Sequence, residues 1–296
     1  MKQQFRKLSF LFSIILLSYS LDAQIHHRIH ANIDPSNHFI QIIDSVTVEG
    51  EGLSEFHLLS SLRITNSYGL KLDTLKETST GDVGMDRSEQ PEKITRAYRF
   101  SKKQKHFVLK YEGEVKGFLA ESKENYQRGF SETHGIISEK GVYLAGSSHW
   151  VPSNEKALHT FDLHVTLPKN WKSVSQGKRM ISHNTADKQV DLWQCDKPQE
   201  EVYLIAAAFH EYSHTMTKGI EAMAFLRSPD EALAEKYLGV TEQYLMMYEE
   251  MIGAFPYTKF ALVENFWETG YGMPSFTLLG EKIIRFPFIL HSSYPH

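Results

Sequence analysis

Apolar and polar residues alternate along most of the chain before residue 228, in short runs separated by glycine, proline, asparagine or aspartate. Ile25, Ile29 and Ile33 fall on one face of such a run, and residues 34–37 have the composition of a turn. Alternation with period two is typical of strands that bury one face. The spacing predicts an antiparallel sandwich or curved sheet, with further strands at 39–43, 96–100, 106–111, 160–167 and 190–194. The polar stretch 77–93 predicts a loop.

The pattern changes to helical spacing at residue 228. Ser228 is suited to cap a helix, with Pro229 at the first helical position and Glu231 three residues after the cap. Apolar residues then recur at helical spacing as far as Ile252. The runs 260–263 and 276–279 predict strands on either side of a loop at 267–275. We therefore expect an amino-terminal β domain over 24–227 and a mixed α and β domain over 228–296.

The amino terminus has the pattern of a secretory signal peptide. Lys2, Arg6 and Lys7 precede an apolar run over 8–17, and small and polar residues continue to Ala23. The apolar run is about half of the roughly 20 residues that a membrane-spanning helix needs. We expect a cleaved signal peptide at 1–23, with cleavage after residue 20 or 23, a secreted or periplasmic protein and no membrane anchor.

Composition narrows the functional classes. The 296 residues are 41% hydrophobic and 23% charged, which excludes a disordered or collagen-like chain. The formal charge is −4 and no long run of one sign occurs, so the electrostatic footprint of a nucleic-acid binder is missing. Cys195 is the only cysteine, so no disulfide within the chain is possible.

The pentapeptide His210-Glu211-Tyr212-Ser213-His214 matches the HExxH pattern of zinc proteases. In a helix the two histidines would lie about 6 Å apart along the axis, whereas a strand would separate them by about 13 Å, too far for one ion. The runs 202–205 and 220–226 favour a hairpin. The alanines at 206–208, with Glu231 or Glu235 as a third ligand, favour a helix and an autonomous zinc protease. We expect a strand with two exposed histidines.

Other histidines offer weaker sites. His26, His27 and His30 alternate along one predicted strand, so they point to opposite faces and we expect them at the surface without a shared metal. His149 lies beside a tryptophan and near a proline, with no serine or cysteine in a strand-turn-helix elbow, and is expected to be a packed loop residue.

The segment 261–280, which contains Gly270-Tyr271-Gly272-Met273, resembles the catalytic-domain entrance of the aminopeptidase N family of zinc metallopeptidases. The segments 141–152 and 161–168 are similar to that family's amino-terminal β domain. The resemblance implies a β sandwich or saddle followed by the first lobe of a thermolysin-like catalytic domain. It also places 210–214 in the last hairpin of the β domain, where the family binds no metal.

The resemblance further implies a peptide substrate, with Gly270, Gly272 and Met273 in the loop along which it lies. His296 looks like the first zinc ligand of an HExxH motif whose other members this sequence lacks. Zinc is thus expected in an intact family member, which would hydrolyse peptides with zinc-activated water. We expect no catalytic residue and no tightly bound zinc in this chain, which we interpret as an inactive fragment.

One departure from the family pattern affects specificity. Pro274 and Ser275 stand where glutamate and asparagine are expected, so the carboxylate that binds a free substrate amino group is absent. Glu264 or Glu268 is the alternative anchor. The alternative function, from a different class, is a secreted, non-catalytic β-rich binding module. The sequence leaves the oligomeric state open.

Overall fold

The structure is a computed structural model that describes residues 24–80, 93–117, 133, 135–154 and 157–286. The predicted signal peptide at 1–23, the part of the predicted loop at 81–92 and His296 lie outside the described residues.

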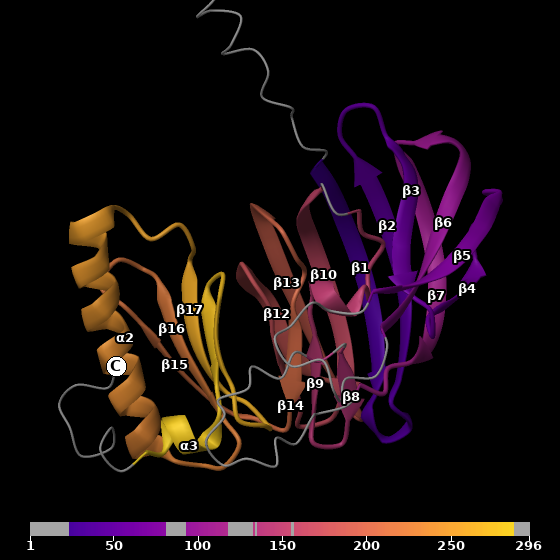
Figure 1. The fold of residues 1–296 in the computed structure, drawn as a ribbon. Helices are drawn as coiled ribbons and strands as arrows, with labels where there is room; N and C mark the ends of the chain where they lie inside the picture. The colour runs from indigo at the N-terminus through magenta and orange to yellow at the C-terminus, as the bar shows by residue number, and fades with distance from the viewer. Residues whose placement is uncertain (1–23, 81–92, 118–132, 134, 155–156, 287–296) are drawn as a thin grey trace, which may run out of the picture.

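The chain is built mainly from strands, in four sheets that follow one another across the molecule (Figure 1). The seven-stranded sheet has the order β12 (Lys178–Asn184), β13 (Lys188–Gln199), β10 (Leu158–Pro168), β1 (Gln24–Asp34), β2 (Phe39–Val48), β7 (His106–Glu114) and β4 (Arg63–Asn66). The three-stranded sheet has the order β3 (Leu53–Leu59), β6 (Lys93–Gln104) and β5 (Leu72–Thr80). The four-stranded sheet has the order β11 (Lys172–Val174), β14 (Leu204–Ala207), β9 (Gly141–Leu144) and β8 (Ile136–Ser138). The five-stranded sheet has the order β15 (His210–Thr215), β16 (Glu221–Leu226), β17 (Lys259–Glu264), β19 (Phe276–Leu279) and β18 (Gly270–Met273).

The β-rich architecture predicted from the alternating pattern is confirmed. Ile25, Ile29 and Ile33 are buried on one face of β1, and the short 3-10 turn Pro35–Asn37 leads into β2. Within the seven-stranded sheet every pairing is antiparallel except that of β1 with β10, which is parallel. The loop predicted over 77–93 is wrong at both ends, because β5 continues to Thr80 and β6 begins at Lys93.

The four-stranded sheet lies between two apolar cores. Leu144 and Leu204 point into the core shared with the seven-stranded and three-stranded sheets, whereas Tyr143 and Ile205 point into the core shared with the five-stranded sheet. Neighbouring residues of a strand face opposite sides. Both faces of β9 and β14 are therefore covered, which explains why these strands read as continuous apolar runs.

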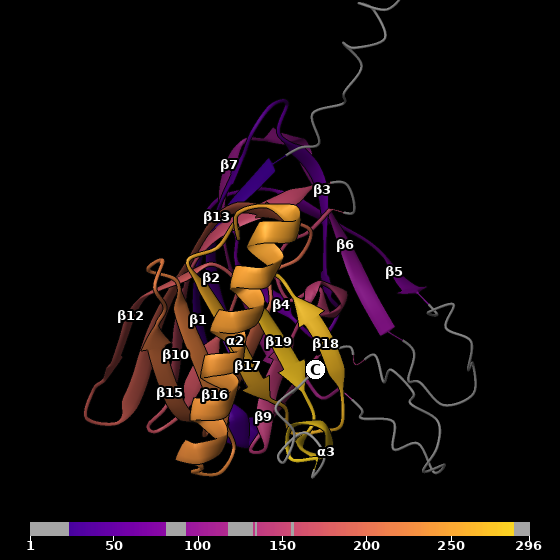
Figure 2. The ribbon, with the colours of Figure 1, turned by 90° about the vertical axis from the view of Figure 1, so that its left-hand side faces the viewer.

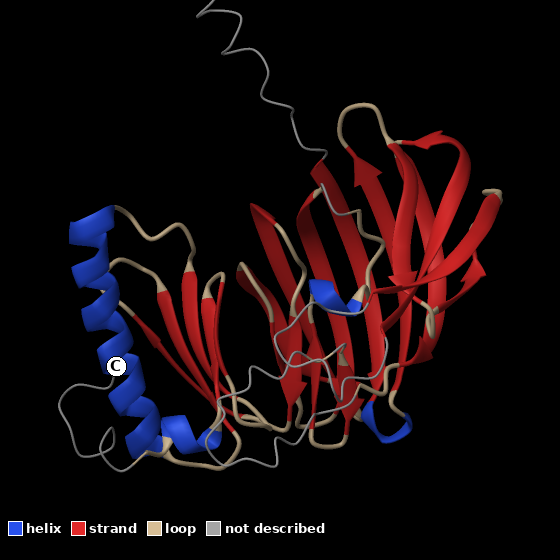
Figure 3. Ribbon diagram, in the orientation of Figure 1, coloured by secondary structure: helices blue, strands red, loops and turns tan. Residues whose placement is uncertain are grey.

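The five-stranded sheet buries its second face beneath helix α2 (Glu231–Ile252), which lies across it in Figure 2. Figure 3 shows that α2 and the short helix α3 (Glu281–Ile284) both lie at this end of the molecule. Strand β16 pairs with β15 in antiparallel and with β17 in parallel. This sheet therefore includes strands from both sides of residue 228. The domain limits themselves stay a prediction.

The long helix is present, but its cap differs from the prediction. The carboxylate of Asp230 accepts a hydrogen bond from the backbone of Leu233 at 3.1 Å, so Asp230 is the N-cap and the helix begins at Glu231. Ser228 instead accepts from Arg285 at 2.9 Å. Within the described residues, no helix is long and apolar enough to cross a membrane.

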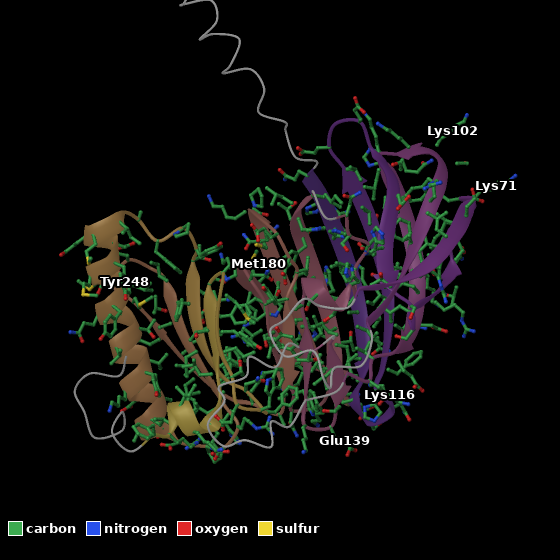
Figure 4. The ribbon with its side chains drawn as sticks, viewed as in Figure 1. Lys71, Lys102, Lys116, Glu139, Met180 and Tyr248 are labelled. Carbon is green, nitrogen blue, oxygen red and sulfur yellow. The ribbon has the colours of Figure 1, made fainter. Side chains whose placement is uncertain are left out.

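The two halves of α2 differ in how they are covered. Leu233, Ala234, Tyr237 and Leu238 pack against the sheet. Beyond them Met246, Tyr248, Met251 and Ile252 are exposed, and Figure 4 labels Tyr248 in the half of the helix away from α3. Tyr248 and Ile252 are thus left uncovered by the described residues.

Candidate functional site

The tetrapeptide Gly270-Tyr271-Gly272-Met273 forms strand β18, so the loop predicted at 267–275 is wrong there. The strand pairs antiparallel with β19, with Gly270 opposite Leu279 and Met273 opposite Phe276. It is the last strand of the five-stranded sheet. Its other edge therefore pairs with no strand among the described residues.

The pairing register decides which backbone groups reach that free edge. The backbone N–H of Gly280 donates to the carbonyl of Thr269 at 2.7 Å, and the Thr277 hydroxyl donates to the carbonyl of Tyr271 at 3.1 Å. Hydrogen-bonded and non-hydrogen-bonded pairs alternate along an antiparallel ladder. The backbone groups of Tyr271 and Met273 thus face β19, whereas those of Gly270 and Gly272 face the free edge.

Side chains leave this edge open. Both glycines are exposed, and a Cβ placed on Gly272 would meet no atom within 4 Å. Met273, by contrast, is buried in the core between the sheets. Of the three residues predicted to bind substrate, two can offer backbone groups to a ligand, and Met273 anchors the strand.

Aromatic side chains flank β18. The ring of Tyr143 lies 5.1 Å from that of Trp267 and 6.4 Å from that of Tyr271, measured between centroids. Phe266 packs edge-on against Trp267 at 4.6 Å. The buried Trp267 Nε1, like the side chains of Asn265 and Thr269, has no hydrogen-bond partner among the described residues. The approach to β18 is therefore apolar, with unused polar groups in the segment that leads to it.

A tight turn connects β18 to β19. Pro274 is followed by Ser275, which has a φ of 70°. Proline and then a residue with positive φ are the two central positions of a type II turn, where glycine or asparagine normally takes the second place. Ser275 carries a side chain in this left-handed conformation, which costs about 1–2 kcal/mol. The surrounding contacts must hold it.

The two acidic residues proposed as substitute amine anchors are engaged elsewhere. Glu264 is buried and accepts hydrogen bonds from Arg285 Nε at 2.9 Å and from the backbone of Arg227 at 2.7 Å. Glu268 accepts from the backbone of Lys282 at 3.1 Å. Glu264 is thus committed to an ion pair within the fold, while Glu268 keeps an exposed side chain.

The HExxH-like segment 210–214 lies on β15, so the predicted strand is confirmed and a helical zinc site is excluded. His210 and His214 are exposed, four residues apart on an extended chain. The carboxylate of Glu211 pairs with Arg179, whose Nη1 is 2.9 Å from Oε2, and lies 3.9 Å from Lys172 Nζ. This glutamate ties β15 to β12, which is a structural role.

The expectation that His27 is a surface residue is wrong. Its side chain is fully buried, and its Nδ1 donates to Asp44 at 2.8 Å. His27 Nε2 lies 3.0 Å from Nδ1 of His159, and burial lowers the pKa of His159 to about 3. The sequence analysis did not predict this row of three side chains, because Asp44 and His159 lie on β2 and β10, the strands on either side of β1.

His159 also lines a hollow of about 480 Å³, together with His57, His149, Glu200 and Glu201. Glu201 accepts from the backbone of Gly146 at 2.9 Å, and His149 Nδ1 lies 3.1 Å from the Ser153 hydroxyl. Across the described ranges, no group of three histidine, cysteine, aspartate or glutamate side chains could hold a metal ion. The hollow therefore offers no metal centre.

Some solved structures of peptidases have a similar fold. One is an M1 zinc metallopeptidase variant from Deinococcus radiodurans bound to a Tyr-Ser-Ala substrate, with a TM-score of 0.62 and 12% identity, matched over 90% of this chain and 63% of that one. A second is the M1 zinc metallopeptidase of the same organism, with a TM-score of 0.60, 12% identity, and matches over 89% and 62%. The chain shares its fold with M1 zinc metallopeptidases.

The chain spans less than two thirds of the length of these structures. No protein-family model and no curated protein matches the sequence. The likeness bears on the fold, and the resemblance read from the sequence points to the same group of proteins.

Lys259 is a site residue that the sequence analysis missed. It is 1% exposed, and its Nζ lies within hydrogen-bond distance of Ser275 at the end of the β18–β19 turn. A lysine that opens the apolar run Phe260-Ala261-Leu262-Val263 is the signal that could have identified it, because a charged residue at a strand position with both faces covered needs a partner.

Proposed function

We propose that this chain is the peptide-binding part of an exported zinc metallopeptidase of the aminopeptidase N type. The observation that carries the proposal is the free edge of β18, where Gly270 and Gly272 direct their backbone groups away from the sheet. The shared fold with M1 zinc metallopeptidases supports it over the non-catalytic binding module.

An extended peptide would bind by adding a strand to this edge. Strand addition gives affinity through main-chain hydrogen bonds and is tolerant of sequence, while pockets for alternate side chains give specificity. The absence of side chains on Gly270 and Gly272 allows the peptide backbone to approach closely. Tyr143, Trp267 and Tyr271 then offer apolar contacts for one of its side chains.

Zinc belongs to this proposal through the resemblance alone. The resemblance makes His296 the first ligand, and zinc would supply an activated water for hydrolysis in an intact family member. The described residues hold no metal-ligand group, so they do not fit zinc and we derive no zinc-dependent step from them.

The remaining assignments are proposals of the same kind. Residues 228–296 would be the first lobe of a thermolysin-like domain, since α2 covers one face of a mixed sheet there. Export rests on the pattern of residues 1–23.

The experiment is isothermal titration calorimetry of the chain with the tripeptide Tyr-Ser-Ala. We expect binding by the native chain and loss of binding in Gly272→Pro, because proline removes an N–H that faces the free edge. Proline is tolerated at edge positions whose N–H points outward. The variant should therefore keep its fold, which circular dichroism checks.

The matched control is Ser213→Pro on the opposite edge of the same sheet. Met216 N–H donates to the carbonyl of Ile220 at 2.8 Å, so by alternation the N–H of Ser213 also faces outward. This variant should bind Tyr-Ser-Ala as the native chain does. Equal affinity in Gly272→Pro, or loss of binding only in Ser213→Pro, would refute β18 as the peptide site.

A further inference from the structure

Lys259 lies between the two apolar cores that flank the four-stranded sheet. The Nζ of Lys259, on β17, donates to the carbonyl of Ser175 at 2.8 Å, which follows β11 in the four-stranded sheet. The same nitrogen lies 3.1 Å from the carbonyl of Ser275 and 2.9 Å from its hydroxyl. The tie therefore runs from the four-stranded sheet to the turn that ends β18.

The surroundings of Lys259 favour a precise position for its nitrogen. Rings of Trp193 and Phe276 lie with their centroids 5.2 Å from Nζ, so the group is enclosed by aromatic faces as well as by its oxygen partners. All three hydrogens of an ammonium find acceptors. A neutral amine would donate to the two carbonyls and accept from the Ser275 hydroxyl, so either protonation state keeps the three contacts.

These contacts meet at the residue that needs support. Ser275 has a left-handed backbone without being glycine. Its hydroxyl also accepts from the backbone of Gly177 at 3.2 Å, and its carbonyl from the backbone of Ala261 at 3.1 Å. Backbone strain of this kind persists only where the surrounding structure over-determines it. Lys259 supplies two of the four contacts.

We propose that Lys259 is a positioning residue for peptide binding: by holding Ser275 in its left-handed conformation it fixes the β18–β19 turn and thereby the orientation of the free β18 edge. The inference rests on the proposed peptide site. It means that the orientation of β18 depends on a residue of another strand, Lys259 of β17, which also contacts Ser175.

Titration gives this role a signature. Burial lowers the pKa of Lys259 to about 7, with a further lowering from Arg179 on β12, whereas Cys195 on β13 and Glu221 on β16 oppose the shift. The amine should change charge near neutral pH, next to Ser275. Methionine at this position would show no such transition.

The first test measures amide hydrogen exchange by NMR in the native chain and in Lys259→Met, which keeps the length of the side chain without its nitrogen. We expect exchange at Tyr271 and Met273 to accelerate about tenfold, and the Kd for Tyr-Ser-Ala to rise by a similar factor. The control Lys282→Met, on the exposed face of α3, should change neither. Unchanged exchange in a folded Lys259→Met protein would overturn the proposal.

The second test adds Ser275→Gly, because glycine adopts a positive φ without strain. In the Lys259→Met background this change should restore most of the protection of β18 and most of the affinity. A double variant no better than Lys259→Met would mean that Lys259 acts by another route, and would count against the proposal.

A third measurement needs no variant and covers the case in which Lys259→Met does not fold. Amide shifts of Ser275 and Phe276 in the native chain should move with a midpoint near pH 7, and Gly270 and Gly272 should follow them. Shifts that move at Ser275 and Phe276 but stay flat at Gly270 and Gly272 would contradict the proposal, because Lys259 would then affect the turn without reaching the β18 edge. If the native chain binds no peptide, the proposed function fails, while the exchange and pH data still decide the role of Lys259.

Discussion

The two edges of the five-stranded sheet present opposite kinds of surface. Strand β15 carries a sequence that matches a zinc-protease motif, yet its glutamate is used to pair with Arg179 and its histidines lie four residues apart on an extended chain. Strand β18 carries two glycines and no charged side chain, yet the backbone groups of Gly270 and Gly272 face an edge that pairs with no strand among the described residues. The side chains of β15 suggest a zinc site that the strand does not form. The backbone of β18 is the part of the sheet that can pair with a peptide.

The two edge strands of this sheet differ in how readily another strand can pair with them. Charged side chains discourage another strand from pairing, and β15 has Glu211 together with Arg179 and Lys172 beside it. Glycines do the reverse, because they leave the edge accessible. We conclude that β15 is protected against strand addition and β18 is suited to it.

The largest expected effect on stability comes from a substitution at Tyr271, whose backbone faces β19. Tyr271→Pro removes a ladder hydrogen bond and should lower the free energy of unfolding by about 3 kcal/mol. Gly272→Pro, one residue later, should change it by less than about 0.5 kcal/mol, because its N–H faces outward. Urea unfolding monitored by tryptophan fluorescence measures both. Similar losses in the two variants would contradict the register from which the site is built.

At the opposite edge, Glu211→Ala tests the structural role of the HExxH-like segment. The Arg179 and Glu211 side chains are 13% and 17% exposed, and removing the carboxylate leaves the guanidinium without its partner. We expect a loss of about 2 kcal/mol in the free energy of unfolding. His210→Ala, at an exposed position, should cost less than about 0.5 kcal/mol. Zinc-dependent peptidase activity that disappears in His210→Ala would overturn this assignment.

The titration of Lys259 predicts that the free energy of unfolding depends on pH. Lys259 releases its proton near pH 7 in the folded chain, whereas an ordinary lysine keeps it to about 10.5. Between these values the unfolded chain binds more protons, so the free energy of unfolding should rise with pH, by about 1 kcal/mol per pH unit. Urea unfolding from pH 7 to pH 8.5 should show this rise. Lys259→Met should lack it.

The Cys195 thiol sets the upper limit of the pH range in which the effect of Lys259 can be measured. Burial raises the pKa of this thiol to about 11, so its contribution has the opposite sign and grows as the unfolded thiol ionises around its ordinary pKa of 9.0. If Lys259→Met and the native chain have the same slope from pH 7 to pH 8.5, the lysine does not titrate in this range.

The smallest expected effect concerns the amino terminus of the peptide. Neither Pro274 nor Ser275 has a carboxylate, and Glu264 is already paired with Arg285. Tyr-Ser-Ala and its acetylated form should therefore bind with affinities within about threefold, less than one charge-assisted hydrogen bond would give. A hundredfold preference for the free amine that is lost in Glu268→Gln would show that Glu268 is a displaced anchor.

Much of the fold could be predicted from local patterns. Strands such as β1 and β10 are long and alternate, β1 along its length and β10 from Phe161 onward, so their positions follow from period two. Strand β18 could not be predicted in this way, because four residues that include two glycines are typical of a loop. It is a strand because β19 supplies its hydrogen bonds. The cap of α2 was misplaced by two residues because Ser228 and Asp230 are both suitable caps, and Arg285 contacts them both.

The site was predicted only in part, for a related reason. The resemblance pointed to Gly270, Gly272 and Met273, but which of them offers backbone groups depends on the register with β19. The positioning role of Lys259 depends on Ser175, a residue 84 positions away. The same holds for His27, whose partner His159 is 132 positions away. Contacts between distant segments leave no periodic signal in a single sequence.

The most direct test of the account is an NMR titration of the native chain with Tyr-Ser-Ala, following the amide resonance of each residue in β18. We predict that the amides of Gly270 and Gly272 shift downfield as they form hydrogen bonds, while those of Tyr271 and Met273 shift little, and that β15 is unaffected. Shifts of equal size at all four residues, or shifts confined to β15 or to the hollow beside His159, would contradict the assignment of the β18 edge as the peptide site.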